Sequence, residues 1–389
     1  MKRVVYTFVL FFLSLSVFAQ EQSDGGVIDP QFSLDYLHGN VLKAKDIEGK
    51  NGSNYIQLSA TMKTGTQDGS FFNWYRKPEV GISGLYGYLG KTDVLGSVFA
   101  LYPTWRYSFF EGHSIGLNVK LGSGFAWFTN PHDKIDNPDN LLIGSHFTSI
   151  TELSLGVWFE FVPECKIEAG VTGLHFSNGH TAIPNYGLND ITAKLGVIYT
   201  PGVLSNKTTR KRTLPTEFDD TWKKTIAFTL GRHELAYSTK PVDGPNYNIY
   251  KLYVGLSKRL TKINEVQFGV SAAYYESYHT FIHLSDYYEH LQHLGATVWT
   301  AHVGHEFLIN RFGLVTELGI KVIDKFYRDY FMDRDWEKLW YKGLFAPKAG
   351  FKFYPIWNSF DKQKLALGMF IKTNGFQADC VEYSLSYTF

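Results

Sequence analysis

The residue types best suited to chemistry lie in the segment LHFSNG, residues 174–179. A serine hydroxyl becomes a nucleophile when a nearby base removes its proton, and histidine is well suited to that task. Residues two apart on a β-strand point to the same face, about 6–7 Å apart at their Cα atoms, so their side chains can meet. We therefore predict that Ser177 attacks an acyl carbonyl and that His175 accepts its proton.

A second polar segment, PNYGLN at residues 184–189, supplies a third candidate. An asparagine oxygen can accept a hydrogen bond from the imidazole ring and so orient a histidine base, as in Cys-His-Asn sites. Asn189 would take this role if a hairpin brings it back beside His175. Backbone amides at Asn178 and Gly179, where a strand would turn into a loop, are candidates for stabilising an oxyanion.

The elements that position these residues are predicted to be β-strands. Beyond the N-terminus the chain alternates apolar and polar residues in segments of about ten, separated by Gly, Asn, Asp and Pro, which is typical of transmembrane β-strands. The final segment alternates up to an aromatic Phe389, a feature that resembles the assembly signal of bacterial outer-membrane barrels. The alternative is a half-buried strand in a secreted β-sandwich.

Sixteen strands are expected, eight on each side of a polar stretch at 205–224. They span approximately 32–41, 55–62, 80–89, 96–107, 114–127, 150–161, 166–177, 190–199, 225–237, 247–260, 266–275, 296–308, 312–324, 344–355, 364–373 and 380–389. Outer-membrane barrels usually have short periplasmic turns, so a connection of about twenty residues favours two units over one large barrel. We predict an all-β protein of two eight-stranded antiparallel barrels; one sixteen-stranded barrel is the alternative.

The site is expected at the lipid-facing rim of the first barrel. Continuing the apolar face of 167–173 by twos reaches His175 and Ser177, and stepping back by two from Ile191 reaches Asn189. Polar groups facing lipid are costly except near the interface, so three of them at one hairpin suggest a functional site. The alternative is a polar collar that only hydrogen-bonds lipid headgroups. His180, in the following loop, is expected at the surface.

These residues resemble the lipid A 3-O-deacylase (PagL) family of small outer-membrane barrels, a kind of acyloxyacyl hydrolase. The resemblance covers approximately 32–199 and is strongest from His175 to Asn189. It implies that His175 is the base and Ser177 the nucleophile, that Asn178 is linked to the oxyanion hole, and that lipid A in the outer membrane is the substrate. This chain departs from the family at Asn189, where an acidic residue is expected.

The second half is expected to be a degenerate copy. Aligning its Thr373-Asn374-Gly375 with the serine motif places Thr373 at the position of Ser177 and Ile371 at the position of His175, so the base is missing. The predicted organisation is a signal peptide at 1–19, a catalytic barrel at 20–204, a linker at 205–224 and a non-catalytic barrel at 225–389.

Composition excludes several other classes of protein. The 38 basic and 37 acidic residues balance, which argues against a nucleic-acid binder, and 44% hydrophobic residues argue against disorder. Past the N-terminus, no apolar run reaches the ~20 residues that a membrane-spanning helix needs. The oligomeric state is left open. Cys165 and Cys380 are predicted at opposite ends of the barrels, too far apart for a disulfide.

No cofactor and no metal are predicted. The sequence 279–293 is rich in histidine, and Glu289 and His293 have the spacing of a metal-binding helical turn, but a solvated extracellular loop is the preferred interpretation. The resulting hypothesis is an outer-membrane serine esterase that removes an acyl chain from lipid A. A non-catalytic barrel that binds or passes solutes or lipids is the alternative.

Overall fold

The structure is a computed structural model. It describes residues 30–42, 47, 51–63, 78–201, 218–234, 242, 244–286, 288, 290–309, 311–329, 336–356, 363–375 and 377–389. The predicted signal peptide, and positions 205–217 of the predicted linker, lie outside these residues. The strand β9 begins at Lys223, two residues before the predicted start of the second unit.

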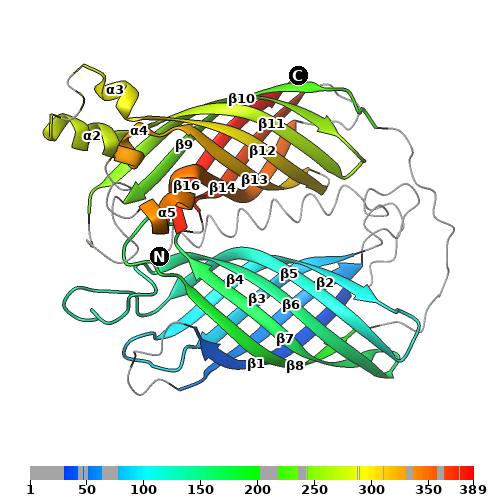
Figure 1. The fold of residues 1–389 in the computed structure, drawn as a ribbon. Helices are drawn as coiled ribbons and strands as arrows, with labels where there is room; N and C mark the ends of the chain where they lie inside the picture. The colour runs from blue at the N-terminus through cyan, green and yellow to red at the C-terminus, as the bar shows by residue number, and fades with distance from the viewer. Residues whose placement is uncertain are drawn as a thin grey trace.

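The described strands close into two eight-stranded antiparallel barrels that lie side by side (Figure 1). The first contains β1 (Pro30–Val41), β2 (Ser53–Lys63), β3 (Glu79–Tyr88), β4 (Ser97–Phe109), β5 (Ile115–Phe128), β6 (Phe147–Val162), β7 (Cys165–Ser177) and β8 (Leu188–Tyr199). The second contains β9 (Lys223–Glu234), β10 (Asn246–Arg259), β11 (Asn264–Tyr275), β12 (Thr297–Ile309), β13 (Phe312–Ile323), β14 (Phe345–Ile356), β15 (Lys364–Asn374) and β16 (Gln377–Thr388). The prediction of two barrels is confirmed, and the sixteen-stranded alternative is wrong.

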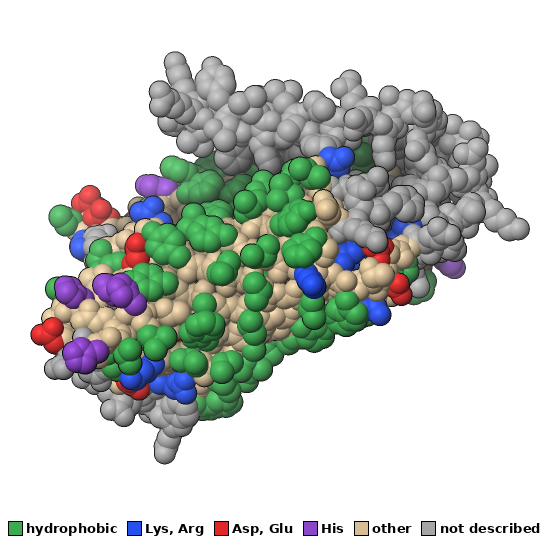
Figure 2. All heavy atoms as spheres, turned by 90° about the horizontal axis from the view of Figure 1, so that it is seen from above, with side chains coloured by type: hydrophobic (Ala, Val, Ile, Leu, Met, Phe, Trp, Pro, Cys, Tyr) green, Lys and Arg blue, Asp and Glu red, His purple; other side chains and the backbone are tan. Residues whose placement is uncertain are grey.

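The barrel walls follow the alternation of the sequence. In β8, Ile191 and Leu195 are 57% and 59% exposed on the outside, whereas Asp190 and Lys194 are buried inside. Successive side chains of a strand point to opposite faces, so this pattern gives each barrel an apolar outer surface. Figure 2 shows hydrophobic side chains spread over the middle of one such surface, with most charged side chains and histidines toward its ends. Such a surface is suited to lipid rather than water.

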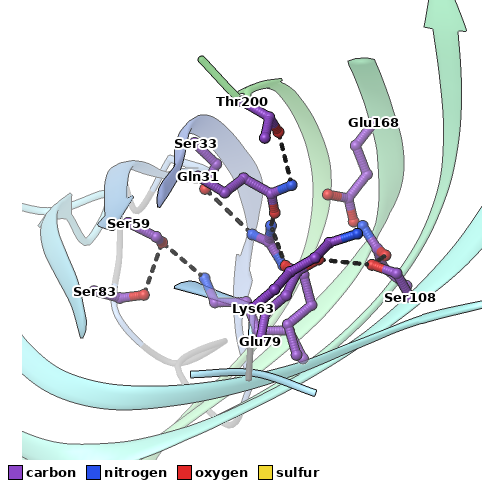
Figure 3. A network of polar contacts seen from close by, with 12 residues as sticks. Gln31, Ser33, Ser59, Lys63, Glu79, Ser83, Ser108, Glu168 and Thr200 are labelled. Atoms are coloured by element: carbon purple, nitrogen blue, oxygen red, sulfur yellow. Dashed lines mark hydrogen bonds and ion pairs between the residues drawn. The ribbon is translucent and has the colours of Figure 1, made fainter. Parts of the chain in front are cut away.

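The interior of the first barrel is filled by paired polar side chains. Lys194 lies 2.5 Å from Glu168, and Lys120 lies 3.3 Å from Glu152, with all four side chains almost fully buried. Figure 3 shows the network continuing through Gln31, Glu79, Ser108 and neighbouring residues. Buried charges are tolerated when they are paired and hydrogen-bonded. An interior filled in this way leaves no wide aqueous channel.

The second barrel is filled in the same manner. Lys251 pairs with Glu382, and Lys352 lies 2.8 Å from Glu306. A cavity of about 20 Å³ beside Lys251 has room for about one water molecule. Neither barrel therefore has the open lumen of a porin.

Short helices occur at one end of the second barrel (Figure 1). They are α2 (Glu276–Leu284), α3 (Gln292–Gly295), α4 (Lys325–Tyr327) and α5 (Trp336–Leu344). The histidine-rich stretch is therefore partly helical, a correction to the predicted loop, because Tyr278, Ile282 and Phe326 pack together in an apolar cluster. No helix in the described part of the chain is long and apolar enough to cross a membrane.

The two cysteines are both free thiols, as predicted. Cys165 begins β7 of the first barrel, and Cys380 lies near the start of β16 of the second barrel. The two cysteines therefore belong to different barrels and lie at opposite ends of the barrels. Cys380 is fully buried among apolar side chains of the second barrel.

Candidate active site

The hairpin of β7 and β8 brings His175 opposite Asn189 in the strand register. The ring Nδ1 of His175 lies 2.7 Å from Oδ1 of Asn189. A carbonyl oxygen can only accept a hydrogen bond, so with this amide orientation Nδ1 carries the ring proton. The other nitrogen, Nε2, is then the basic one and is able to accept a proton from a hydroxyl group.

The hydroxyl of Ser177 lies at the end of β7, where two donors surround it. The backbone N–H of Gly179 donates to Oγ at 3.2 Å, and Nδ2 of Asn185 donates to the same atom at 3.1 Å. Among the described contacts, no hydrogen bond joins Ser177 to His175. Such bonds are often absent from unliganded sites and form only when the substrate is bound.

A glycine keeps the space between base and nucleophile open. Gly187 has φ +72°, and a Cβ built on it would lie 3.3 Å from Cε1 of His175 and 4.0 Å from Cβ of Ser177. The two candidate catalytic side chains therefore approach the same point. A side chain at position 187 would both crowd the ring and force a left-handed backbone that favours glycine.

The loop after Ser177 is folded by the side chain of Asn178. Its Oδ1 accepts from the N–H of His180 at 3.0 Å, and its Nδ2 donates to the carbonyl of Ala182 at 2.8 Å. The N–H of Asn178 donates to Oδ1 of Asn185 at 3.5 Å. The amide of Gly179 thus faces Ser177 directly, whereas that of Asn178 faces the side chain of Asn185.

His180 departs from the expectation from sequence. The sequence predicts a surface position for His180, but its side chain is only 4% exposed and its backbone has φ +72°. A non-glycine residue in this backbone region is strained and persists only when its surroundings hold it in place. The sequence shows polar residues in this loop, but not what packs over them.

The side chains of His175 and Asn189 lie on the outer wall of the first barrel, whereas the side chain of Ser177 is buried. His175 is exposed and Asn189 is half-buried, whereas Ser177 is only 6% exposed. The adjacent Asp190 points inward, as alternation predicts, and accepts a 2.6 Å hydrogen bond from Tyr55. Asp190 therefore cannot replace Asn189 beside the ring.

Asn185 is the residue that reasoning from sequence missed. Its side chain donates to Ser177 and accepts from the amide of Asn178, and it is 8% exposed. The signal was present in the segment PNYGLN, but strand alternation could not place a loop residue. Gly187, in the same segment, was also not singled out.

The second barrel lacks this chemistry at the equivalent place. In the β15–β16 hairpin, Ile371 lies opposite Val381, as His175 lies opposite Asn189 in β7–β8. The hydroxyl of Thr373 has two carbonyl acceptors within reach, that of Gly375 at 2.7 Å and that of Pro347 at 3.1 Å. An apolar pair therefore stands where the first barrel has its histidine and asparagine.

The histidine-rich region forms an aromatic stack. The ring of His279 lies 4.5 Å from that of His293 and 6.1 Å from that of His283, in near-parallel planes. Burial, then the charges of His293 and His283, lower the pKa of His279. No group of three or more metal-binding side chains occurs among the described residues, from which Glu289 is missing.

Comparison with known proteins supports a lipid A deacylase-like barrel. Residues 54–197 match the family model for lipid A 3-O-deacylase (PagL), which confirms the resemblance over that segment. No curated protein matches the chain.

Several solved outer-membrane proteins are similar in structure. The outer membrane enzyme PagL has 18% identity, covering 42% of this chain and 97% of its own, with a TM-score of 0.30. Neisserial surface protein A has 10% identity, covering 44% and 96%, with a TM-score of 0.31. The N-terminal β-barrel domain of Pseudomonas aeruginosa OprF has 14% identity, covering 45% and 99%, with a TM-score of 0.26.

The family match and the closed barrels with apolar outer walls identify a bacterial outer-membrane protein.

Proposed function

We propose that this outer-membrane protein, whose residues 54–197 match the lipid A 3-O-deacylase family, is a serine esterase that hydrolyses an acyl ester of lipid A. The observation that supports this most strongly is the 2.7 Å contact between His175 and Asn189 on the hairpin that also carries Ser177. It leaves the histidine with a basic nitrogen on the same strand as a serine two residues away, and nucleophilic catalysis requires such a base within reach of the serine.

In the proposed mechanism, Oγ of Ser177 attacks the ester carbonyl while Nε2 of His175 takes the serine proton. The tetrahedral intermediate places negative charge on the former carbonyl oxygen, where N–H donors stabilise it. The amide of Gly179 and the side chain of Asn185 already lie within 3.2 Å of Oγ and so stand beside that position. The amide of Asn178 is a further donor in the same loop.

Collapse of this intermediate breaks the ester bond. His175 then delivers its proton to the departing sugar oxygen, and the fatty acyl group stays on Ser177. Water, deprotonated by His175, releases the fatty acid and restores the serine. Asn189 holds the ring in one tautomer throughout. The steps require no cofactor from the protein.

The position of the site suits a substrate that stays in the membrane. His175 is exposed on the apolar outer wall, at the end of β7 where the strand meets its loop. The acyl chains of a lipid in the outer leaflet could lie along that wall while the ester reaches Ser177. The filled interior offers no comparable path for a solute.

The test compares lipid A masses from cells that carry the intact protein, a Ser177→Ala variant or no copy. Loss of one acyl chain is expected only with Ser177 in place. Ser123→Ala is the control, because Ser123 is a half-buried serine on the outer wall of the same barrel, 3.5 Å from Thr151 and outside the β7–β8 hairpin. An identical lipid A profile in all cells would refute the esterase and leave a non-catalytic barrel.

A further inference from the structure

The second barrel contacts the loop that follows Ser177. Glu234, the last residue of β9, is only 3% exposed. One carboxylate oxygen accepts from the N–H of Ile183 at 2.8 Å, and the N–H of Glu234 itself donates to the carbonyl of His180 at 3.2 Å. The other carboxylate oxygen accepts from the N–H of Gly244 in its own barrel. One buried residue therefore connects the two barrels.

A close apolar contact lies beside this connection. A Cβ on Gly179 would be 2.5 Å from Cγ2 of Val381 and 3.9 Å from Cγ1 of Ile371, so only glycine fits there. Gly179 also has φ +64°, which favours glycine independently. Val381 is half-buried, whereas Tyr383, two residues further along the same strand, is 56% exposed. The outer wall of the second barrel is therefore covered at Val381 and open at Tyr383.

The contact explains how His180 keeps its strained backbone. Its N–H is held by Asn178 from within the loop, and its carbonyl is held by Glu234 from the second barrel. Residues 179 and 180 both have positive φ, so their peptide planes are fixed only while these partners stay in place. The direction of the Gly179 N–H, which faces Ser177, depends on the same planes.

We propose that the second barrel positions the loop 178–183 of the first barrel, which carries the proposed oxyanion donor Gly179. Glu234 is the positioning residue, and Val381 is the surface against which Gly179 packs. This inference rests on the proposed esterase function. The second barrel has an apolar pair in place of a base and its partner, and its outer wall serves as a support for the site of the first. Hydrolysis therefore requires both barrels, although only one contains the nucleophile.

The experiment uses the full-length protein with Glu234→Ala and Glu234→Gln. The alanine variant loses both carboxylate oxygens, which accept from the N–H groups of Ile183 and Gly244. Glutamine keeps one oxygen and so can accept from only one of these N–H groups. Glu276→Ala is the matched control, because Glu276 also accepts a backbone N–H, from Asn248 at 3.0 Å, but entirely within the second barrel. Hydrogen exchange of the amides in 178–183 and the kinetics of lipid A deacylation are measured for each variant.

We expect exchange in 178–183 to rise about tenfold or more in Glu234→Ala. We expect kcat to fall about 10- to 100-fold with KM within about twofold, because small displacements of a catalytic group cost this much. Glu234→Gln should lie between wild type and Glu234→Ala in both measurements. Glu276→Ala should match wild type in both.

Unchanged exchange in Glu234→Ala would overturn the proposal, and so would faster exchange with unchanged kcat. A variant that fails to fold is recognised by loss of its β-sheet circular-dichroism signal, and Glu234→Gln then decides by the same criteria. Absence of hydrolysis by the wild-type protein would refute the esterase function and with it the catalytic role of Glu234. Faster exchange in Glu234→Ala would still show that the contact orders the loop.

Discussion

Asn189 offers the sharpest test of the proposed mechanism. Its Oδ1 lies 2.7 Å from Nδ1 of His175, a short distance for a hydrogen bond between neutral groups. Asn189→Asp keeps the shape of the side chain and replaces the neutral acceptor with a charged one. Asn189→Leu keeps most of the volume and removes the acceptor. Asn189→Glu supplies a charged acceptor on a longer side chain.

The expected magnitudes follow from hydrogen-bond energies. A neutral hydrogen bond contributes about 0.5–1.5 kcal/mol, and one with a charged partner contributes about 1.5–3 kcal/mol. Because about 1.4 kcal/mol is a factor of ten in rate, Asn189→Leu should lower kcat about 2- to 10-fold at neutral pH. Asn189→Asp should preserve kcat or raise it by up to about tenfold, since a carboxylate stabilises the imidazolium that forms in the transition state. Asn189→Glu should also preserve or raise it.

The assay is initial-rate deacylation of purified lipid A in detergent micelles, with product masses measured over time. Asn54 provides matched controls, because its Oδ1 lies 2.9 Å from Nδ1 of His38 in the same barrel. Asn54→Leu and Asn54→Asp make the same chemical changes beside a histidine that has no role in the mechanism, so they should leave kcat unchanged. Equal kcat in wild type and all three Asn189 variants would remove Asn189 from the mechanism and leave only His175 and Ser177.

Two further predictions concern the oxyanion donors and the barrel interiors. Asn185→Ala should lower kcat about 10²- to 10³-fold with little change in KM, as loss of an oxyanion donor does, and a loss below threefold would contradict this role. In planar bilayers the protein should show no channel of porin size, because Arg106 and Lys120 fill the first barrel and Lys251 the second. A large stable conductance would mean that the interiors are not filled as described.

Much of the fold could be read from the sequence because a strand in a membrane barrel obeys a strict period of two. Apolar residues such as Ile191 and Leu195 alternate with Asp190 and Lys194, and the structure places the first pair outside and the second inside. The same period, followed from each strand into the hairpin, predicted that Asn189 would meet His175. Both predictions rest on local geometry, which neighbouring residues of one hairpin determine.

The features that depended on the tertiary structure involve loops and distant segments. Alternation ends at Ser177, so it could not show that Asn185 reaches the serine hydroxyl or that His180 is buried. The closure of two barrels was only weakly favoured by a long connection, because strand pattern is the same in one large barrel and two small ones.

The contact of Glu234 with the loop after Ser177 could not be found from the sequence at all. These residues lie more than fifty positions apart and belong to different barrels. Their approach depends on how the two folded barrels pack against each other. That packing is determined by the shapes of the outer surfaces and not by the alternation of apolar and polar residues along either segment. The sequence determined the strands and the chemistry they carry, and the packing of the barrels determined what supports that chemistry.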